Sequence, residues 1–238
     1  MKRFDDVEDP RRRLVLLALG AGLLAAPAAG AGLLGDVPDK LPPGRSVYRL
    51  DGQVLVNGKP ATLDTLIGPE DTVETGVDGQ IIFVVGQDAY NLRGGSKLVL
   101  ATQRQQGRVV RALNLLSGAL LSVFGRAEQR IYTSTATIGI RGTGVYAEAD
   151  PELTYFCTCY GTVDLTSKQD PNSRETIQSK HHDRPVYILG KPGGGKHIRT
   201  APMKNHSDAE LALIEELVGR TPPFVFGTDD YVAPRRDY

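Results

Sequence analysis

The two cysteines of the chain, Cys157 and Cys159, are the residues whose type and spacing point most directly to chemistry. They lie in an alternating, strand-like run two positions apart, so both side chains should point to the same face. A mutual disulfide is disfavoured, because such positions are roughly 6–7 Å apart whereas bridged Cβ atoms lie about 3.8 Å apart. The spacing therefore predicts two free thiols that act as a pair, either as metal ligands or as small core residues.

Histidines supply the remaining donors of such a metal site. His181 and His182 follow the cysteines in a polar stretch, and His206 or His197 could add a further imidazole. Thiolates and imidazoles together suit Zn²⁺ or copper, which are the only cofactors that the sequence suggests. The alternative is that the cysteines are core residues and the histidines are exposed loop residues. The expected metal ligands are Cys157, Cys159, His181 and His182.

A glycine-rich stretch at 190–197 resembles a phosphate-binding loop but lacks its working parts. His197 stands where a Ser or Thr would hold Mg²⁺, and Pro202 interrupts the helix that should receive the phosphates. The sequence contains no nucleophile elbow, zinc-protease helix or dinucleotide fingerprint. We therefore expect no nucleotide ligand and no enzymatic activity. The alternative is a zinc- or copper-binding periplasmic redox or metal-handling protein that uses Cys157 and Cys159 as working ligands.

Charge excludes another class of partner. Lys and Arg total 28, as do Asp and Glu, so the chain has no basic excess with which to bind a phosphate backbone. Nucleic acid is therefore not an expected partner. The 40% of hydrophobic residues is enough to bury a core.

The elements that must position these residues are mainly β-strands. Short runs rich in Val, Ile, Leu and Thr alternate with turn signals, a rhythm typical of a compact β-sandwich or a short β-solenoid. Asn57-Gly58 predicts a type I′ hairpin. One C-terminal α-helix is predicted at 207–219, where Ser207 and Glu210 form a capping box and Gly219 ends the apolar stripe. The expected strands are 46–50, 53–56, 80–86, 89–92, 97–101, 109–116, 119–124, 130–133, 138–145, 157–165 and 185–189.

The N-terminal 31 residues are typical of an export signal. Arg11, Arg12 and Arg13 precede an uncharged stretch that is interrupted by Pro27, and we expect cleavage after Ala31. The paired arginines resemble a twin-arginine signal, which serves the export of folded proteins. The expected location is therefore the periplasm, followed by a linker at 32–43. The alternative is that the segment stays uncleaved and anchors the chain in the inner membrane, facing the periplasm.

Four sequence blocks resemble the FecR-like periplasmic domain of iron-dicitrate sensor proteins. The blocks contain the Asn57-Gly58 turn, a Thr-Gly-x-Asp-Gly element, an apolar run before Gly118, and an Ile-Arg-Gly-Thr element that is followed by a second glycine strand. They occupy residues 53–58, 71–80, 113–120, and 137–143 with 160–163. The shared structural motif comprises Gly139, Arg141, Gly142, Thr143 and Gly161.

The resemblance implies an all-β domain at 44–166 that binds another protein of the cell envelope. The remaining residues, 167–238, form a C-terminal extension with a loop region and the helix. Only thirteen residues precede the apolar stretch, so the cytoplasmic sigma-factor-binding role of the sensors is not carried over. Within the motif, Gly142 is expected to allow a tight bend, and Arg141 is expected to pair with a carboxylate such as Glu148 or Asp150. The cysteine pair does not belong to the family pattern.

Overall fold

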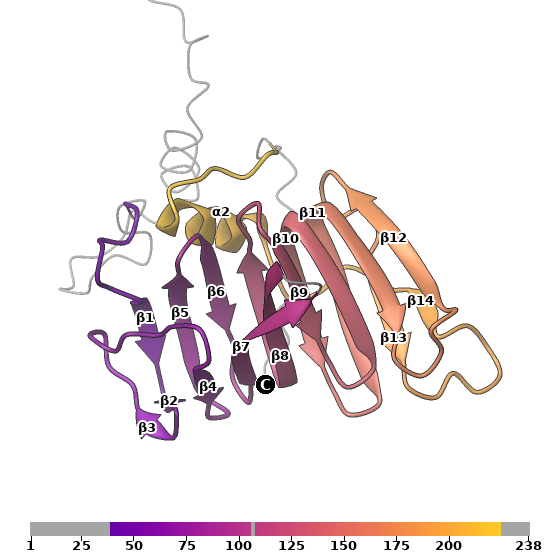
Figure 1. Ribbon diagram of the computed structural model, residues 1–238, viewed down its shortest axis with the longest axis horizontal. Helices are drawn as coiled ribbons and strands as arrows, with labels where there is room; N and C mark the ends of the chain where they lie inside the picture. Colours follow the sequence, from indigo (N-terminus) through magenta and orange to yellow (C-terminus); the bar gives the residue numbers. More distant parts are fainter. Residues whose placement is uncertain (1–38, 106–107, 225–238) are drawn as a thin grey trace, which may run out of the picture.

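The computed structural model describes residues 39–105 and 108–224, which form one hydrogen-bonded sheet of fourteen strands and a single helix (Figure 1). The prediction of a mainly β protein with a C-terminal helix is confirmed. The strands are β1 (Val47–Asp51), β2 (Val54–Val56), β3 (Lys59–Pro60), β4 (Thr72–Thr75), β5 (Gln80–Val85), β6 (Asp88–Leu92), β7 (Lys97–Gln105), β8 (Arg108–Val123), β9 (Glu128–Tyr132), β10 (Ala136–Ala149), β11 (Leu153–Ser167), β12 (Arg174–Ser179), β13 (Val186–Leu189) and β14 (Ile198–Thr200), and the helix is α2 (Asp208–Leu217).

Three long strands, β8, β10 and β11, each pair with different neighbours along their two halves. The second half of β8 pairs with β6 and β10, whereas its first half pairs with β7 and β9. In the same way β11 pairs with β13 near its start and with β12 near its end. The sheet thus divides into a helix-side layer, which contains β1, β5, β6, β13 and β14, and a distal layer, which contains β2, β3, β4, β7, β9 and β12.

A glycine in the left-handed region lies where each long strand passes between the layers. The φ angles are +80° at Gly118, +59° at Gly142 and +93° at Gly161. A Cβ atom at Gly161 would lie 2.3 Å from Thr143 Cγ2, so this position has neither the backbone freedom nor the space for a larger residue. The expected bend at Gly142 is therefore part of a row of three bends.

The Arg141 side chain does not pair as the sequence suggested. Its Nη2 donates to Asp164 Oδ2 at 2.9 Å on the neighbouring strand, whereas Glu148 binds Lys204. The predicted partners, Glu148 and Asp150, were wrong because the register places Asp164 opposite Gly139, diagonally across from Arg141. The Arg141 side chain is 72% exposed, so this ion pair contributes little to stability.

One buried cluster joins the inward faces of both layers. It includes Ile81 and Ala147 from the helix-side layer and Leu98, Ile138 and Val163 from the distal layer. Because residues from both halves share one cluster, the halves pack face to face, which is the arrangement of a sandwich folded from one continuous sheet. A second cluster covers the outer face of the helix-side layer and contains both cysteines together with Leu211, Ile214 and Leu217 of α2.

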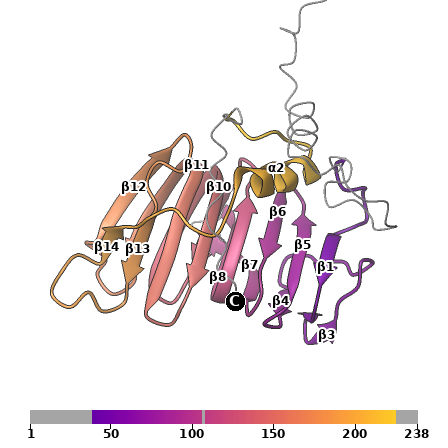
Figure 2. The same cartoon turned by 180° about the vertical axis from the view of Figure 1, so that it is seen from behind.

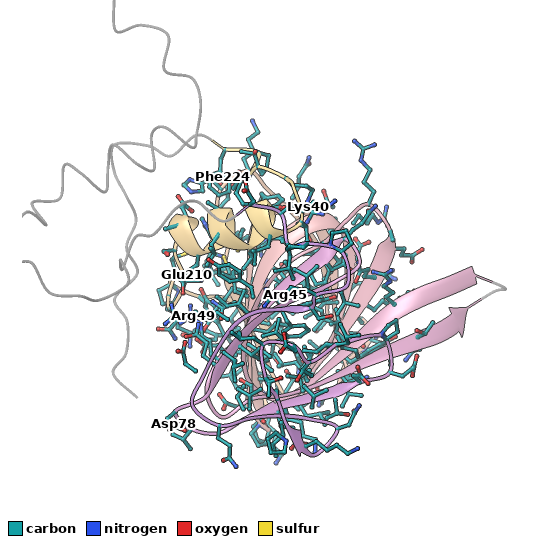
Figure 3. All side chains as sticks on the ribbon, turned by 90° about the vertical axis from the view of Figure 1, so that its left-hand side faces the viewer. Lys40, Arg45, Arg49, Asp78, Glu210 and Phe224 are labelled. Atoms are coloured by element: carbon teal, nitrogen blue, oxygen red, sulfur yellow. The ribbon has the colours of Figure 1, made fainter. Side chains whose placement is uncertain are left out.

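Helix α2 covers this outer face on one side of the molecule, as the edge-on view shows (Figure 3). The predicted capping box is present, because Glu210 N–H donates to the Ser207 hydroxyl and Ser207 N–H donates to the Glu210 carboxylate. Gly219, with φ +72°, follows the helix, and the Leu41 N–H donates to the Leu217 carbonyl at 3.0 Å. The helix is thereby held at both ends.

The sheet continues beyond residue 166. Besides the strand at 185–189, which is β13, the sequence predicted only a loop region and the helix there, but β12 returns to pair with β11, and β14 adds a further strand. Residues 201–207, which we call the arm, lead from β14 to α2 across the outer face of the helix-side layer (Figure 2). The predicted signal at 1–31 and most of the linker at 32–43 lie outside the described residues. Within the residues described, no helix is long and apolar enough to cross a membrane.

Candidate metal centre

Four side chains from three separate segments converge on the outer face of the helix-side layer. Cys157 and Cys159 come from β11, His182 from the loop after β12, and His206 from the arm. One ligand atom from each lies within 4.8 Å of all the others. Both cysteines are fully buried and unbridged, His206 is 2% exposed, and the His182 side chain is 8% exposed. We call this group the Cys–His cluster.

The distances within the cluster are those of ligands around one ion. His182 Nδ1 lies 3.5 Å from Cys157 Sγ and 3.1 Å from His206 Nε2. Ligands at about 2.0–2.3 Å from a tetrahedral ion are separated by roughly 3.3–3.8 Å from one another. The cluster could therefore hold an ion with only small adjustments of its side chains.

Hydrogen bonds on the far side of each imidazole direct the two inner nitrogens toward the cluster. His182 Nε2 lies 2.9 Å from Asp208 Oδ1, and His206 Nδ1 lies 2.8 Å from the Lys204 carbonyl oxygen. Each outer nitrogen must donate its proton to an oxygen, so in the neutral rings both inner nitrogens are acceptors. Two acceptors 3.1 Å apart require a proton or a cation between them. A histidine that donates its second N–H to a carboxylate is a common partner of a metal ion.

The charges of the cluster favour a thiolate beside an imidazolium when no metal is bound. Burial lowers the pKa of His182, but its hydrogen bonds to Asp208 and Cys157 outweigh that effect and raise this pKa to about 9. The contact with Cys159, together with the two histidines, holds the pKa of Cys157 well below its usual value despite burial. Burial and the neighbouring Cys157 sulfur raise the pKa of Cys159. The contact of Cys157 Sγ with His182 Nδ1 at 3.5 Å therefore favours Cys157 over Cys159 as the thiolate of the pair.

The backbone is strained at two positions of the cluster. His182 has φ +52° and Asn205, which precedes His206, has φ +62°. Left-handed backbone costs of order 1–3 kcal/mol at residues other than glycine, although Asn and His adopt it more readily than most, and such positions recur at functional sites. The placement of both histidines thus depends on the left-handed backbone at His182 and Asn205, which by itself costs free energy.

The structure brings together some of the predicted ligands and separates others. Cys157, Cys159 and His182 meet as expected, and His206 completes the set. His181 lies at the edge, where its Nε2 is 2.7 Å from Asp208 Oδ2 and its side chain is 40% exposed. His197 contacts the Leu189 carbonyl oxygen between β13 and β14 and lies outside the Cys–His cluster.

Sequence reasoning missed two residues that surround the cluster. Asp208, whose carboxylate contacts both His181 and His182, is the first residue of α2 and is typical of an ordinary helix N-terminus. Met203 Sδ lies 3.9 Å from Cys157 Sγ, and nothing in the local sequence distinguishes it. Their roles follow only from the path of the arm.

Cys157, His182 and Asp208 also make the contacts of an activated cysteine nucleophile with its base and orienting carboxylate. Cys157, however, is 0% exposed and is flanked by Met203. A substrate carbonyl cannot approach its sulfur in this arrangement. The geometry therefore favours ligation over nucleophilic catalysis.

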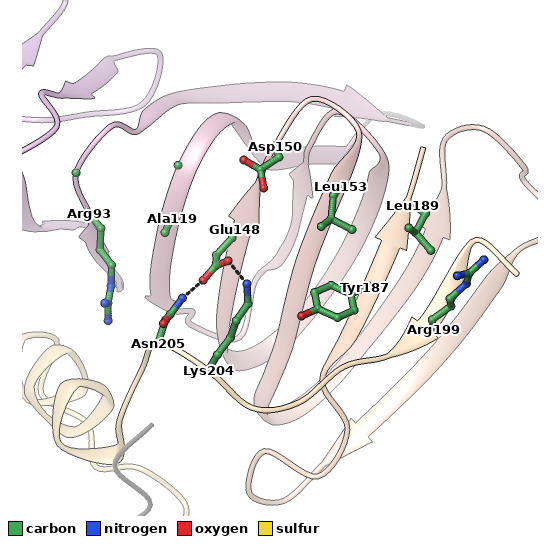
Figure 4. Close-up of a pocket in the computed structure, with 12 residues that line it drawn as sticks. Arg93, Ala119, Glu148, Asp150, Leu153, Tyr187, Leu189, Arg199, Lys204 and Asn205 are labelled. Atoms are coloured by element: carbon green, nitrogen blue, oxygen red, sulfur yellow. Dashed lines mark hydrogen bonds and ion pairs between the residues drawn. The ribbon is translucent and has the colours of Figure 1, made fainter. Parts of the chain in front are cut away.

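A cavity of about 510 Å³ lies beside the arm, and in its wall Lys204 and Asn205 of the arm bind Glu148 (Figure 4). Glu148 accepts hydrogen bonds from Lys204 and Asn205 at 2.5 Å each and from the Tyr146 hydroxyl at 2.8 Å. Burial raises the pKa of Glu148, but these three donors outweigh it and lower that pKa. The Tyr146 ring stacks on His206 with centroids 4.5 Å apart. The charged groups of this cavity hold the arm in place.

A second cavity, of about 800 Å³, lies between the end of α2 and the bends of the long strands. Its lining includes His181, Tyr160 and Arg220, and the Tyr160 hydroxyl donates to Glu215. Arg220 Nε in turn donates to Glu215 at 2.7 Å. This cavity reaches the edge of the Cys–His cluster through His181 but not its sulfur atoms.

No protein-family model matches the chain. No curated protein matches it at a significant level. Among solved structures, similarity is found to two crystal structures of a candidate anti-sigma factor from Parabacteroides distasonis ATCC 8503. The TM-scores are 0.43 and 0.42, with 10% and 11% sequence identity. Each match covers 55% of this chain and 58% of the other, so the chain spans less than two thirds of these neighbours. Similarity at this level says nothing about function.

Proposed function

We propose that the chain is a non-enzymatic module of the cell envelope that binds another protein, and that a metal ion in the Cys–His cluster holds its C-terminal helix on the sheet. The observation that carries the metal is the convergence of two sulfurs with two imidazoles whose inner nitrogens both face the cluster. The resemblance of the sequence to FecR-like domains supports the binding role.

The closed, buried set of donors favours a structural ion. Catalytic zinc sites keep one coordination position open to water or substrate, whereas structural sites have four protein ligands and no access. Here the cysteines belong to the sheet, and the histidines belong to segments that must be held against it. An ion would therefore cross-link β11 to the loop after β12 and to the arm that leads into α2.

The export signal supports a location in the periplasm, with the uncleaved anchor as the alternative. A twin-arginine-like route would carry the chain already folded, so the ion would be bound before export. A buried ion would also protect two thiols that otherwise enter an oxidising compartment unpaired. The N-terminal residue of the protein isolated from the envelope tests this part of the proposal.

Metal content tests the proposed centre. The chain from residue 32 onward is purified under reducing conditions, its free thiols are counted, and bound metal is measured by mass spectrometry. We expect one ion per chain in the wild type and in His197→Ala, and less than a tenth of that in His206→Ala. Protein with two free thiols and no stoichiometric zinc or copper, after exposure to both ions, would contradict the proposal.

A further inference from the structure

A thioether sulfur lies beside the Cys–His cluster. Met203 is in the arm three residues before His206, is half-buried, and packs against the same apolar cluster as the cysteines. Its Sδ is 3.9 Å from Cys157 Sγ. The cluster therefore offers a fifth donor whose chemistry differs from that of the other four.

Two of the contacts within the cluster meet at one nitrogen atom, His182 Nδ1. Cys157 Sγ and His206 Nε2 both contact His182 Nδ1, at 3.5 and 3.1 Å. Cys159 Sγ instead lies 4.0 Å from the Cys157 carbonyl oxygen of its own strand. Cys157, His182 and His206 thus offer three neighbouring donors, with Met203 next to the Cys157 sulfur atom.

One thiolate and two imidazoles in a trigonal arrangement with a long axial thioether are the donors of a copper site. Zinc sites use thiolate, imidazole and carboxylate, and a thioether adds nothing to them. Resting on the proposed metal centre, we infer that the resident ion is copper, bound by Cys157, His182 and His206 with Met203 as the axial ligand.

The distances agree with this assignment. Donors at about 2.0–2.2 Å from an ion, with angles of about 100–120° between them, are separated by roughly 3.1–3.8 Å, a range that contains the two contacts of His182 Nδ1. A thioether at roughly 2.9 Å along the axis would lie about 3.6 Å from the thiolate sulfur, about 0.3 Å less than the observed 3.9 Å. The charge also balances, because Cu²⁺ would meet one thiolate and the adjacent Asp208 carboxylate.

The test is a titration of the metal-free, reduced protein with Cu²⁺, followed by absorption and electron paramagnetic resonance. We expect an intense thiolate-to-copper absorption band in the visible range that saturates at one equivalent and is absent in Cys157→Ser. Met203→Leu should shift the band and raise the reduction potential, because an axial donor stabilises Cu²⁺ more than Cu⁺. His197→Ala is the matched control and should leave the band unchanged.

Competition with zinc separates this inference from the proposed function. We expect one equivalent of Zn²⁺ to leave at least nine tenths of the copper bound in the wild type. Tight zinc binding that displaces copper would overturn the copper assignment and leave a structural metal centre. A copper band that Met203→Leu does not alter would overturn the axial role of Met203. Binding of neither ion would overturn both proposals.

Discussion

The bend at Gly161 predicts that three glycine-to-alanine variants, at Gly161, Gly95 and Gly139, will differ sharply in stability. At Gly161 the backbone has φ +93° and a Cβ would lie 2.3 Å from Thr143 Cγ2. The left-handed backbone costs an L-residue about 1–2 kcal/mol, and overpacking adds about 1–3 kcal/mol. Gly161→Ala should therefore lower the free energy of unfolding by roughly 2–5 kcal/mol, or roughly 4–20 °C of melting temperature for a chain of this size.

Two other glycines serve as matched controls. Gly95 has φ +66°, and a Cβ added there would have no atom within 4 Å, so Gly95→Ala measures the backbone cost alone, about 1–2 kcal/mol. At Gly139 a Cβ would make an ordinary contact of 3.7 Å with Asp164 Cβ, so Gly139→Ala should be neutral or stabilising by up to about 1 kcal/mol.

Urea unfolding, followed by circular dichroism and intrinsic tyrosine fluorescence, measures all three variants under the same conditions. The order of stability should be Gly139→Ala, then Gly95→Ala, then Gly161→Ala. If Gly161→Ala lost no more than Gly95→Ala, close packing at Thr143 would not be what reserves this position for glycine. The explanation of the bend between the layers would then be refuted.

Three further predictions concern the metal centre, the arm and the helix. Metal held at about 1,000 times its dissociation constant should stabilise the protein by about 4 kcal/mol, so a chelator should lower the melting temperature by roughly 8–16 °C in the wild type and by less than 2 °C in His206→Ala, measured by calorimetry. Because the folded pKa of Glu148 is lowered, its contribution to stability should be complete above the unfolded pKa of about 4.3 and lost as the pH falls through the folded pKa. Glu148→Gln should cost about 1.5–3 kcal/mol at pH 7 and flatten this acid limb in urea titrations, and an unchanged limb would contradict the assignment. Ser207→Ala should cost about 1 kcal/mol of stability, since it removes the helix cap, whereas Ser207→Asn should retain most of it.

The β class and the capped helix could be predicted because local signals determine them. The Asn57-Gly58 turn, with φ +51° and +74°, and the Ser207 capping box each lie within a few residues of sequence. Two predicted strands, 109–116 and 119–124, are instead one strand, β8, because Gly118 bends the chain without ending its hydrogen bonding. A glycine that bends a strand and a glycine that ends one look alike in sequence.

The cysteines and His182 of the candidate centre could be predicted from residue type, but its final composition could not. His206 and His197 were equal alternatives in the sequence, and the arm decides between them by crossing the helix-side layer. Asp208 and Met203 could not be recognised, because they come from segments far along the chain from the cysteines and act only through tertiary contacts. The positions of Asp208 and Met203 beside the Cys–His cluster depend on the whole fold.

The three bent strands also determine how the molecule unfolds. Because β8, β10 and β11 run through both layers, neither layer can melt without breaking strands that the other needs. The described chain should therefore exchange its amide hydrogens as one cooperative unit, with the edge strands β1, β3, β12 and β14 opening earlier. Contacts between residues distant in sequence dominate the fold, so folding should be slow, and the helix can dock only after its sheet has formed. A metal centre built on that sheet would report the completion of folding.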